Sequence, residues 1–105
     1  MMYNSSAGGR KNARWSLKHK VFNPKAGTKV GWARAKQLAN EKSLSKKDVL
    51  DMWRWFRRHK KNKTVPYKYK NCPYMDRGYL MWMAWGGDAE EHNINRIYNT
   101  IKSNR

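Results

Sequence analysis

The chain has 105 residues, the size of one ordinary domain, and its 24 Lys and Arg residues against 7 Asp and Glu residues give a formal net charge of +17 at pH 7. Six Trp, six Tyr and two Phe side chains can bury enough area for a small core, which excludes disorder throughout the chain. A single cysteine, Cys72, excludes an intramolecular disulfide and a cysteine-rich zinc site, and it fits a reducing compartment.

The positive charge is unevenly distributed along the chain. Residues 1–75 hold 20 basic and 3 acidic side chains, whereas residues 76–105 hold 4 of each. So large a charge exceeds what solubility needs and indicates a polyanionic partner. Phosphate backbones are the commonest such partner, and an anionic membrane surface is the main competitor. Because the N-terminal residues lack the apolar core of a signal peptide and no apolar run could span a membrane, we expect a soluble protein inside a cell or a virion.

The N-terminal segment is expected to be a basic arm. Its first dozen residues, with NSS and AGG, are typical of a frayed end. The following RKNARWSLKHKVF favours a short helix with Ala13, Leu17 and Val21 on one side, and Pro24 ends it. This divides the chain into a partly ordered basic arm, residues 1–27, and a single helical domain, residues 28–105.

The segment KVGWARAKQLAN is expected to form a helix that follows Thr28 as its N-cap. The apolar spacing predicts a side that faces inward and a side that faces elsewhere. The inward residues are Val30, Ala33 and Leu38, and the residues facing elsewhere include Arg34 and Lys36.

The clearest local signal lies in LSKKDVLDMWRWF. Ser45 with Asp48 three residues later resembles a capping box, and Leu44 with Val49 can form a hydrophobic staple around it. A helix that begins near Lys46 is therefore predicted.

This helix should bury one face and expose a basic one. The i, i+3, i+4, i+7 pattern predicts the core residues Val49, Met52, Trp53 and Phe56. It places Arg54, Arg57, Arg58 and Lys61 on the flank and outer face. One interpretation is a solvated face whose cations complement the C-terminal helix dipole. The absence of any acid from Met52 to Met75 favours a binding surface instead, since a merely solvated face usually mixes both signs.

The segment KKNKTVPYKYKNCPY is expected to be an extended loop or a short edge strand. Alternation would place Tyr67 and Tyr69 on one side and Lys68 and Lys70 on the other. Either the tyrosine rings cover the core, or the lysines contact phosphates.

Two further helices complete the prediction. The first begins at Asp76 as N-cap, ends at the Gly86-Gly87 pair and is apolar all round, as expected of a central helix. The second begins at Asp88 as cap, with Glu91 at the third helical position. Its apolar stripe consists of Ile94, Ile97, Tyr98 and Ile101.

Catalytic chemistry is not indicated. The histidines His19, His59 and His92 lie on three different segments, without metal-ligand spacing. Four carboxylates could in principle bind magnesium for a nuclease: Asp48, Asp51, Asp76 and Asp88. Three of the four are already explained as helix-start residues. No glycine-rich phosphate loop has the required spacing. We therefore expect no enzymatic activity, no catalytic residue, no metal and no cofactor. A small nuclease stays open as a third reading that needs carboxylates beside the basic face.

Three motifs together resemble a small, poorly characterised module of bacteriophage genomes. Its pattern runs as a GxARAxQLAN helix, a Ser-capped helix ending FxRH, and a GYxAWxxWGGDA element. The matching positions here are Ala33, Arg34, Ala35, Gln37, Leu38, Ala39 and Asn40, then Phe56, Arg58 and His59, then Trp82, Trp85, Gly86, Gly87, Asp88 and Ala89.

The resemblance spans about residues 31–89 and departs from the family pattern at Glu90, Glu91 and His92, where members tend to continue with Gly and a further Trp. It implies a viral origin, with the protein in the host cytoplasm during infection or inside the virion. It implies no enzymatic role, and it strengthens DNA as the polyanion.

The sequence thus predicts an all-α protein: a compact bundle of four to five short helices with a basic N-terminal arm and one Tyr/Lys-rich loop. The expected function is binding of nucleic acid, with double-stranded DNA favoured, through phosphates and with low or modest sequence specificity. The expected binding surface is built by the helix that begins near Lys46, the loop that follows it and the N-terminal arm. The candidate binding residues are Arg54, Arg57, Arg58, Lys60, Lys61, Lys63, Lys46, Lys47, Arg34, Lys68 and Lys70.

The alternative is a minor virion or structural protein, or a small inhibitor that binds an acidic host protein. Exposed and clustered Trp15, Trp32 and Trp55 would favour this alternative, because these residues lie off or at the edge of the predicted core stripes. Membrane binding is not expected, since Trp53 and Phe56 have a burial site against the apolar helix. The sequence does not predict the oligomeric state.

Overall fold

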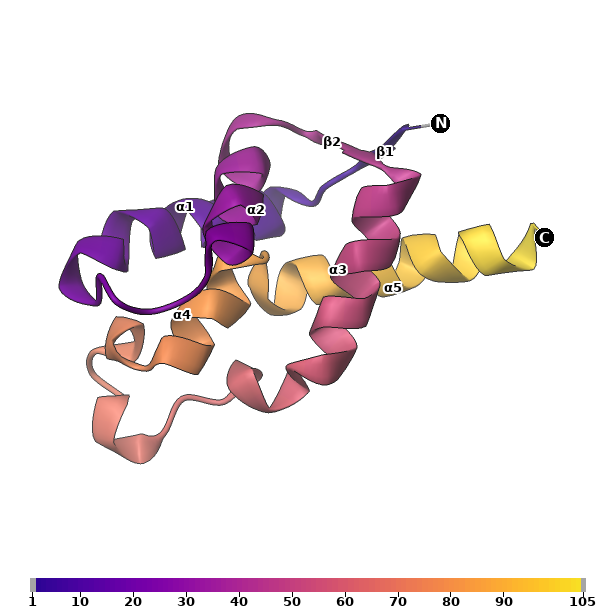
Figure 1. The fold of residues 1–105 in the computed structure, drawn as a ribbon. Helices are drawn as coiled ribbons and strands as arrows, with labels where there is room; N and C mark the ends of the chain where they lie inside the picture. The colour runs from indigo at the N-terminus through magenta and orange to yellow at the C-terminus, as the bar shows by residue number, and fades with distance from the viewer. Residues whose placement is uncertain (1, 105) are drawn as a thin grey trace.

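A computed structural model describes residues 2–104, and it is all-α apart from one small sheet (Figure 1). The helices are α1 (Ala7–His19), α2 (Lys29–Asn40), α3 (Lys46–Arg58), α4 (Arg77–Ala84) and α5 (Gly87–Ser103). Short 3-10 turns are η1 (Lys20–Phe22), η2 (Lys60–Lys63), η3 (Tyr67–Tyr69) and η4 (Pro73–Met75). Strands β1 (Met2–Asn4) and β2 (Ser43–Ser45) pair antiparallel. The predicted fold class is confirmed.

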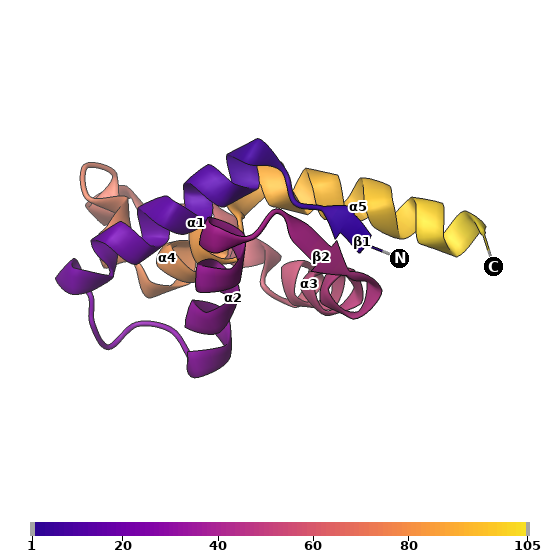
Figure 2. The same ribbon diagram turned by 90° about the horizontal axis from the view of Figure 1, so that it is seen from above.

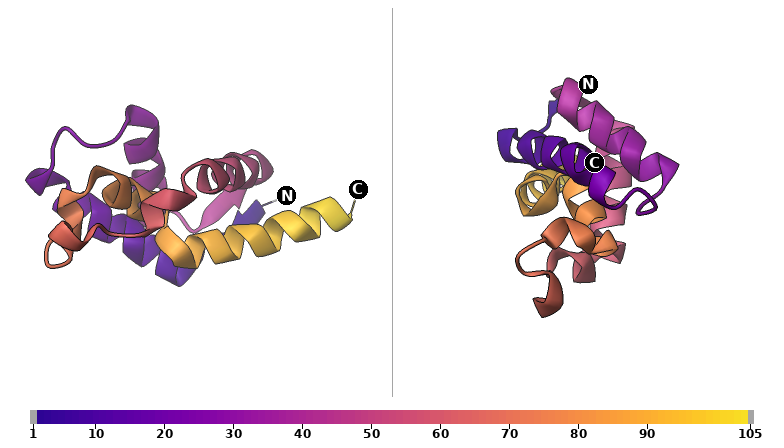
Figure 3. Two further views of the ribbon diagram at one scale, coloured as in Figure 1. Left: turned by 90° about the horizontal axis from the view of Figure 1, so that it is seen from below. Right: turned by 90° about the vertical axis from the view of Figure 1, so that its left-hand side faces the viewer.

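Helix α4 lies at the centre of the packing, as its sequence predicts. Helix α1 packs against α2, α4 and α5, while α3 packs against α5. Within α4, Leu80 and Trp82 are fully buried, and Phe56 of α3 meets Trp82 edge-on. The C-terminal part of α5 projects beyond the other helices, and the segment with η3 and η4 lies at the opposite end of the molecule (Figures 1 and 3). The molecule is accordingly elongated, 44 × 25 × 21 Å.

The expectation of a frayed N-terminus is wrong. Strand β1 places Tyr3 opposite Leu44 of β2, and the two strands lie beside α3 (Figure 2). Helix α1 then begins at Ala7, because the Ser6 side chain accepts a hydrogen bond from the Gly9 amide at 2.9 Å. The first residues are therefore tied into the same fold as the rest of the chain.

The face that α1 buries is only partly the predicted one. Ala13 is fully buried, and Leu17 is half-buried against the core. Val21, however, is 72% exposed. The α-helix ends at His19 and the chain tightens into the 3-10 turn η1, so the four-residue spacing no longer holds at Val21.

The register of α2 differs from the prediction. Val30 and Ala33 are exposed, whereas Trp32 and Ala35 are buried; Leu38 is buried as expected. The indole of Trp32 donates a hydrogen bond to the Ala26 carbonyl at 2.9 Å. Burying this large ring removes more apolar area from water than burying Val30 would, and its one donor is satisfied.

The capping box and staple at the start of α3 are confirmed. The Ser45 hydroxyl accepts from the Asp48 amide and the Asp48 carboxylate accepts from the Ser45 amide, both at 3.0 Å. Leu44 and Val49 are fully buried beside them. Helix α3 begins at Lys46, as predicted.

The core stripe of α3 is right at all but one position. Val49, Met52 and Phe56 are buried, but Trp53 is half-buried and packs against Tyr98 of α5. Trp55, which the pattern places off the core, is 8% exposed. The core therefore extends around the helix toward α2 and α4.

The Tyr/Lys-rich loop is not a strand. Residues Tyr67–Tyr69 form the 3-10 turn η3, so the expected alternation of tyrosines and lysines on opposite sides does not occur. The Tyr67 ring is 81% exposed, which excludes it from a strap over the core.

The start of α5 also differs from the prediction. The helix begins at Gly87, with Gly86 as N-cap, and Asp88 accepts a hydrogen bond from the Trp82 indole at 2.7 Å instead of capping. Gly86 and Gly87 have φ angles of 112° and 66°. These left-handed values favour glycine and allow the sharp turn from α4 into α5. Of the predicted stripe, Ile94, Ile97 and Ile101 are buried and Tyr98 is half-buried.

Candidate nucleic-acid interface

Most of the cations predicted to bind phosphate on α3 and the turn after it lie where α3 ends. Arg57, Arg58, Lys61 and Lys63 lie within seven consecutive residues there, are exposed, and form no ion pair among residues 2–104. Lys60 lies among them, but its Nζ is 3.7 Å from a Glu91 carboxylate oxygen. These side chains protrude from the last turn of α3 and from η2, so their charges are open to a ligand.

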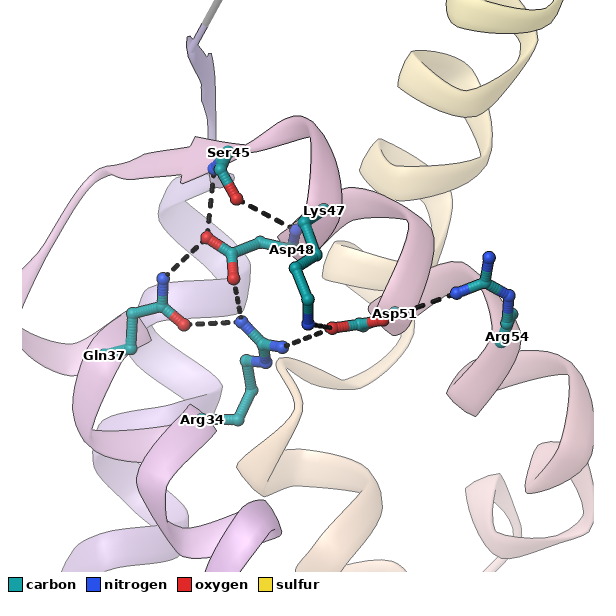
Figure 4. A network of polar contacts seen from close by, with 7 residues as sticks. All are labelled: Arg34, Gln37, Ser45, Lys47, Asp48, Asp51 and Arg54. Carbon is teal, nitrogen blue, oxygen red and sulfur yellow. Dashed lines mark hydrogen bonds and ion pairs between the residues drawn. The ribbon is translucent and has the colours of Figure 1, made fainter.

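Arg34 has a different environment. Its side chain is 10% exposed, and Nη1 donates to Asp48 at 2.8 Å and to Gln37 at 2.6 Å. Nη2 lies 3.8 Å from Asp51 (Figure 4). Arg34 thus joins α2 to α3 as part of a buried polar network, and most of its charge is already balanced.

The same network perturbs the pKa of Asp48. Burial alone would raise the pKa of this carboxyl, but hydrogen bonds from Arg34, the Ser45 backbone and side chain, and Gln37 outweigh burial and lower the pKa to about 2. Asp48 therefore stays ionised and holds Arg34 in place.

The cations at the start of α3 form a separate group. Lys46 is exposed, while Lys47 donates to Asp51 at 2.9 Å, and Arg54 lies 3.3 Å from the same carboxylate. A helix rises about 1.5 Å per residue, so Lys46 and Lys47 lie roughly 17 Å from the cations at the end of α3. Asp51 neutralises part of the stripe between the two groups.

The loop lysines lie over tyrosine rings. The Lys70 Nζ is 4.7 Å from the centre of the Tyr67 ring, and the Lys68 Nζ is 5.0 Å from that of Tyr69. Both lysines are exposed, at the end of the molecule away from the C-terminus (Figure 3).

The structure adds cations that sequence reasoning missed. Three hollows, of about 510, 380 and 210 Å³, share Thr28 in their linings, at the N-cap of α2. Their basic and histidine lining residues are Arg34, Arg54, Arg58 and His59 in the first, Lys20, Lys25, Lys29 and Lys36 in the second, and His59 and Arg77 in the third. Asp51 is the only acid lining them.

A sequence signal for these residues exists. No Asp or Glu occurs before Glu41, so the first 40 residues are as free of acids as the run from Met52 to Met75. The predicted binding surface includes the N-terminal arm, but the prediction names none of the cations of residues 1–27. Since α1 packs on α2 and α4, the cations that follow α1 lie beside the N-terminus of α2, where Lys20 and Lys25 line the second hollow together with Thr28.

Aromatic rings form the wall of the first hollow. Trp55 stacks on Trp85, with ring centres 4.6 Å apart, and on His59, with centres 4.5 Å apart. The Arg34 guanidinium lies 5.2 Å from the centre of the Trp85 ring. Trp55 and Trp85 are 8% and 4% exposed, so neither offers an open face on which a base could stack.

The tryptophans proposed to discriminate between partners do not form an exposed cluster. Trp32 and Trp55 are buried, and Trp15 is half-buried against Tyr79 and His19. The feature that would favour a protein partner is thus not present.

The histidines lie on separate elements. His19 and His59 each donate from Nδ1 to the carbonyl four residues earlier, at 2.8 and 3.0 Å, while His92 is exposed on α5. Among residues 2–104, no group of three or more His, Cys, Asp or Glu side chains is placed to hold a metal ion. In the same part of the chain no helix combines the length and apolar character needed to cross a membrane.

Comparison of the chain with family models, with curated proteins and with solved structures finds no match.

Proposed function

We propose that the protein binds nucleic acid, double-stranded DNA in the first place, through its phosphates and with low or modest sequence specificity. The observation that carries this proposal is the convergence around Thr28 of cations from the η1–α2 segment, α3 and α4. Most of them form no ion pair among residues 2–104, and Asp51 is the one acid that lines the three hollows. An array of exposed cations that lack carboxylate partners attracts a phosphate backbone at long range and releases counterions on contact. No catalytic step forms part of the proposal.

We also propose that the protein is viral, because its motifs resemble those of a bacteriophage module. A viral protein of this kind would meet DNA in the host cytoplasm or in the virion. The motif residues Arg58 and His59 belong to the proposed interface, since both line the first hollow.

The placement of the aromatic and basic side chains favours contact with phosphates over reading of bases. The aromatic rings of the first hollow, Trp55, Trp85 and His59, are covered by one another, and the basic side chains at the end of α3 come from a helix end and a turn. Such groups reach the backbone and fix orientation, whereas base edges are read by an element that enters a groove.

A protein partner is the second candidate. Val21 and Phe22 are 72% and 56% exposed beside the basic residues Lys20 and Lys25, an arrangement that an acidic protein with an apolar patch could cover. This candidate predicts binding that depends on Phe22 as much as on the cations.

The experiment is a fluorescence-anisotropy titration of a labelled duplex of about 20 base pairs across a salt series, with an unrelated duplex and polyglutamate as competitors. If about six to ten phosphates are contacted, affinity falls by about three to five powers of ten between 50 and 200 mM salt. Similar affinity for the two duplexes is expected. Displacement by polyglutamate as readily as by DNA would reject the proposal and direct attention to an acidic protein.

A further inference from the structure

The first hollow contains buried donors without acceptors. Arg34 and Trp85 line it, and Arg34 Nε and Trp85 Nε1 lie beneath its surface with no hydrogen-bond partner among residues 2–104. Buried N–H groups are nearly always paired, because an unpaired one has lost its hydrogen bonds to water without replacement. Each therefore indicates an acceptor that the protein chain itself does not supply.

The N-terminus of α2 provides one more donor at the same hollow, the Val30 amide, and a second beside it, the Lys29 amide. Thr28 Oγ1 accepts from the Gly31 amide at 3.0 Å, but the amides of Lys29 and Val30 have no acceptor within the described chain. Thr28 and Val30 both line the hollow. The positive end of the helix dipole favours an anion there.

Cations complete the mouth of the hollow. Arg58 is exposed and forms no ion pair within the described residues, and His59, whose Nδ1 is engaged with the Trp55 carbonyl, has no partner for its Nε2 in the same part of the chain. The single acid, Asp51, is shared among Arg34, Lys47 and Arg54. The hollow therefore has an excess of donors and of positive charge.

We propose that this hollow, between the N-terminus of α2 and the C-terminal half of α3, is a seat for one phosphoryl group. Guanidinium groups and free helix amides bind oxyanions, and phosphate matches the arginine fork. A base is disfavoured because the faces of Trp55 and Trp85 are covered. A volume of about 510 Å³ admits a phosphate with part of its sugar but not a duplex.

Two sources can supply this group: a phosphate of a nucleic-acid backbone, or a free phosphate such as that of a mononucleotide. The first source rests on the proposed function, and the second does not. In either case the oxyanion lies against the α2 amides and Arg58, and the unpaired donors of Arg34 and Trp85 turn toward it.

Two-dimensional ¹H–¹⁵N NMR of the full chain, titrated with inorganic phosphate, tests the seat. The expected result is a saturable shift of the Val30 amide and the Trp85 indole signals that chloride at equal ionic strength does not reproduce. The indole signals of Trp32 and Trp82 serve as internal controls, because Ala26 and Asp88 already accept from them.

Two variants make the test specific. Arg58→Gln, which changes an exposed side chain, is expected to weaken phosphate binding about tenfold, the loss of one charge-assisted hydrogen bond. Lys102→Gln, an exposed residue of α5 outside the hollow, is expected to leave the phosphate affinity unchanged. Equal shifts with chloride, no saturable shift, or equal affinities for the two variants would overturn the proposal.

The source is resolved by adding the DNA duplex to the phosphate-saturated protein. Release of the bound phosphate by the duplex, followed by the ³¹P signal of inorganic phosphate, identifies a backbone phosphate, whereas duplex binding that leaves the phosphate bound identifies a free phosphate. Duplex binding without any phosphate-specific shift would reject the seat and leave the proposed DNA binding intact. Phosphate-specific shifts without duplex binding would support the seat and reject the proposed DNA binding.

Discussion

The buried carboxylate of Glu90 accepts hydrogen bonds from both the backbone amide and the hydroxyl of Ser6, at 2.9 and 3.0 Å. Its other oxygen accepts from the Asn93 amide group at 2.8 Å. Glu90 is fully buried, and it lies where α1 begins, so the positive end of that helix faces the negative charge. Through this contact α5 fixes the start of α1 and, with it, the position of the cations that follow α1.

Glu90→Ala should lower the free energy of unfolding by about 2–4 kcal/mol, because it leaves the donors of Ser6 and Asn93 unpaired and opens a cavity. Urea denaturation followed by circular dichroism measures this loss. Glu41→Ala, which changes an exposed acid, is the control and should change stability by less than about 0.5 kcal/mol. Equal stabilities of the two variants would contradict the role of Glu90.

Gly86→Ala should also destabilise the fold, by about 2–4 kcal/mol. The residue has a φ of 112°, and an added Cβ would collide with the Glu90 side chain. Thermal unfolding measures the effect, with Ala89→Gly at an exposed position of α5 as a control for helix propensity, which costs about 1 kcal/mol. A Gly86→Ala variant as stable as the wild type would show that the turn accepts a side chain.

The lowered pKa of Asp48 makes part of the stability depend on pH. The folded-state pKa is about 2 against the ordinary 3.8, so the ionised carboxylate contributes stability above about pH 4. This contribution, about 1–2 kcal/mol, is lost as the pH falls through about 2. Denaturant unfolding of the wild type and Asp48→Asn between pH 2 and pH 6 should show a stability gap that closes toward low pH. A gap that stays constant would mean that ionisation is not its cause.

The salt dependence of DNA binding should distinguish unpaired from paired lysines. Lys61→Ala removes an exposed, unpaired cation and should reduce the magnitude of the log–log salt slope by about 0.9, the value for one phosphate contact. Lys47→Ala removes a lysine that already pairs with Asp51, so its effect should be clearly smaller. Anisotropy titrations across salt measure both slopes. An equal reduction for both would place the contact surface along all of α3.

Short-range signals were predicted well because the interacting residues are neighbours in the chain. The Ser45–Asp48 capping box and the start of α4 after its Asp76 cap depend on contacts within a few residues, and the structure has them as expected. The predicted break at Gly86 and Gly87 is also present, although α4 itself ends at Ala84. The burial of Glu90 depends on Ser6, 84 positions away, and no local pattern marks an acid as buried.

The candidate site, too, was predicted well only where its residues are neighbours in the chain. The cations at the end of α3 follow from its helical period, but the part of the site around Thr28 requires α1, α2 and α3 to be placed relative to one another. Arg34 was assigned to the binding surface because its helix position looked exposed, yet Asp48 holds it inside a polar network. Trp32 shows why the buried face of α2 was predicted wrongly. The turn before α2 supplies the Ala26 carbonyl as a hydrogen-bond partner, and α2 therefore buries the Trp32 indole instead of Val30.

The most direct test of phosphate binding at this surface compares two variants of equal charge. Arg58→Gln with Lys61→Gln removes two cations at the end of α3, and Lys42→Gln with Lys102→Gln removes two exposed cations elsewhere. Duplex affinity is measured for both by anisotropy at one salt concentration. The interface described here predicts that the first pair weakens binding about tenfold or more relative to the second. Equal weakening by the two pairs would show that net charge alone attracts DNA and would contradict a defined phosphate-binding surface.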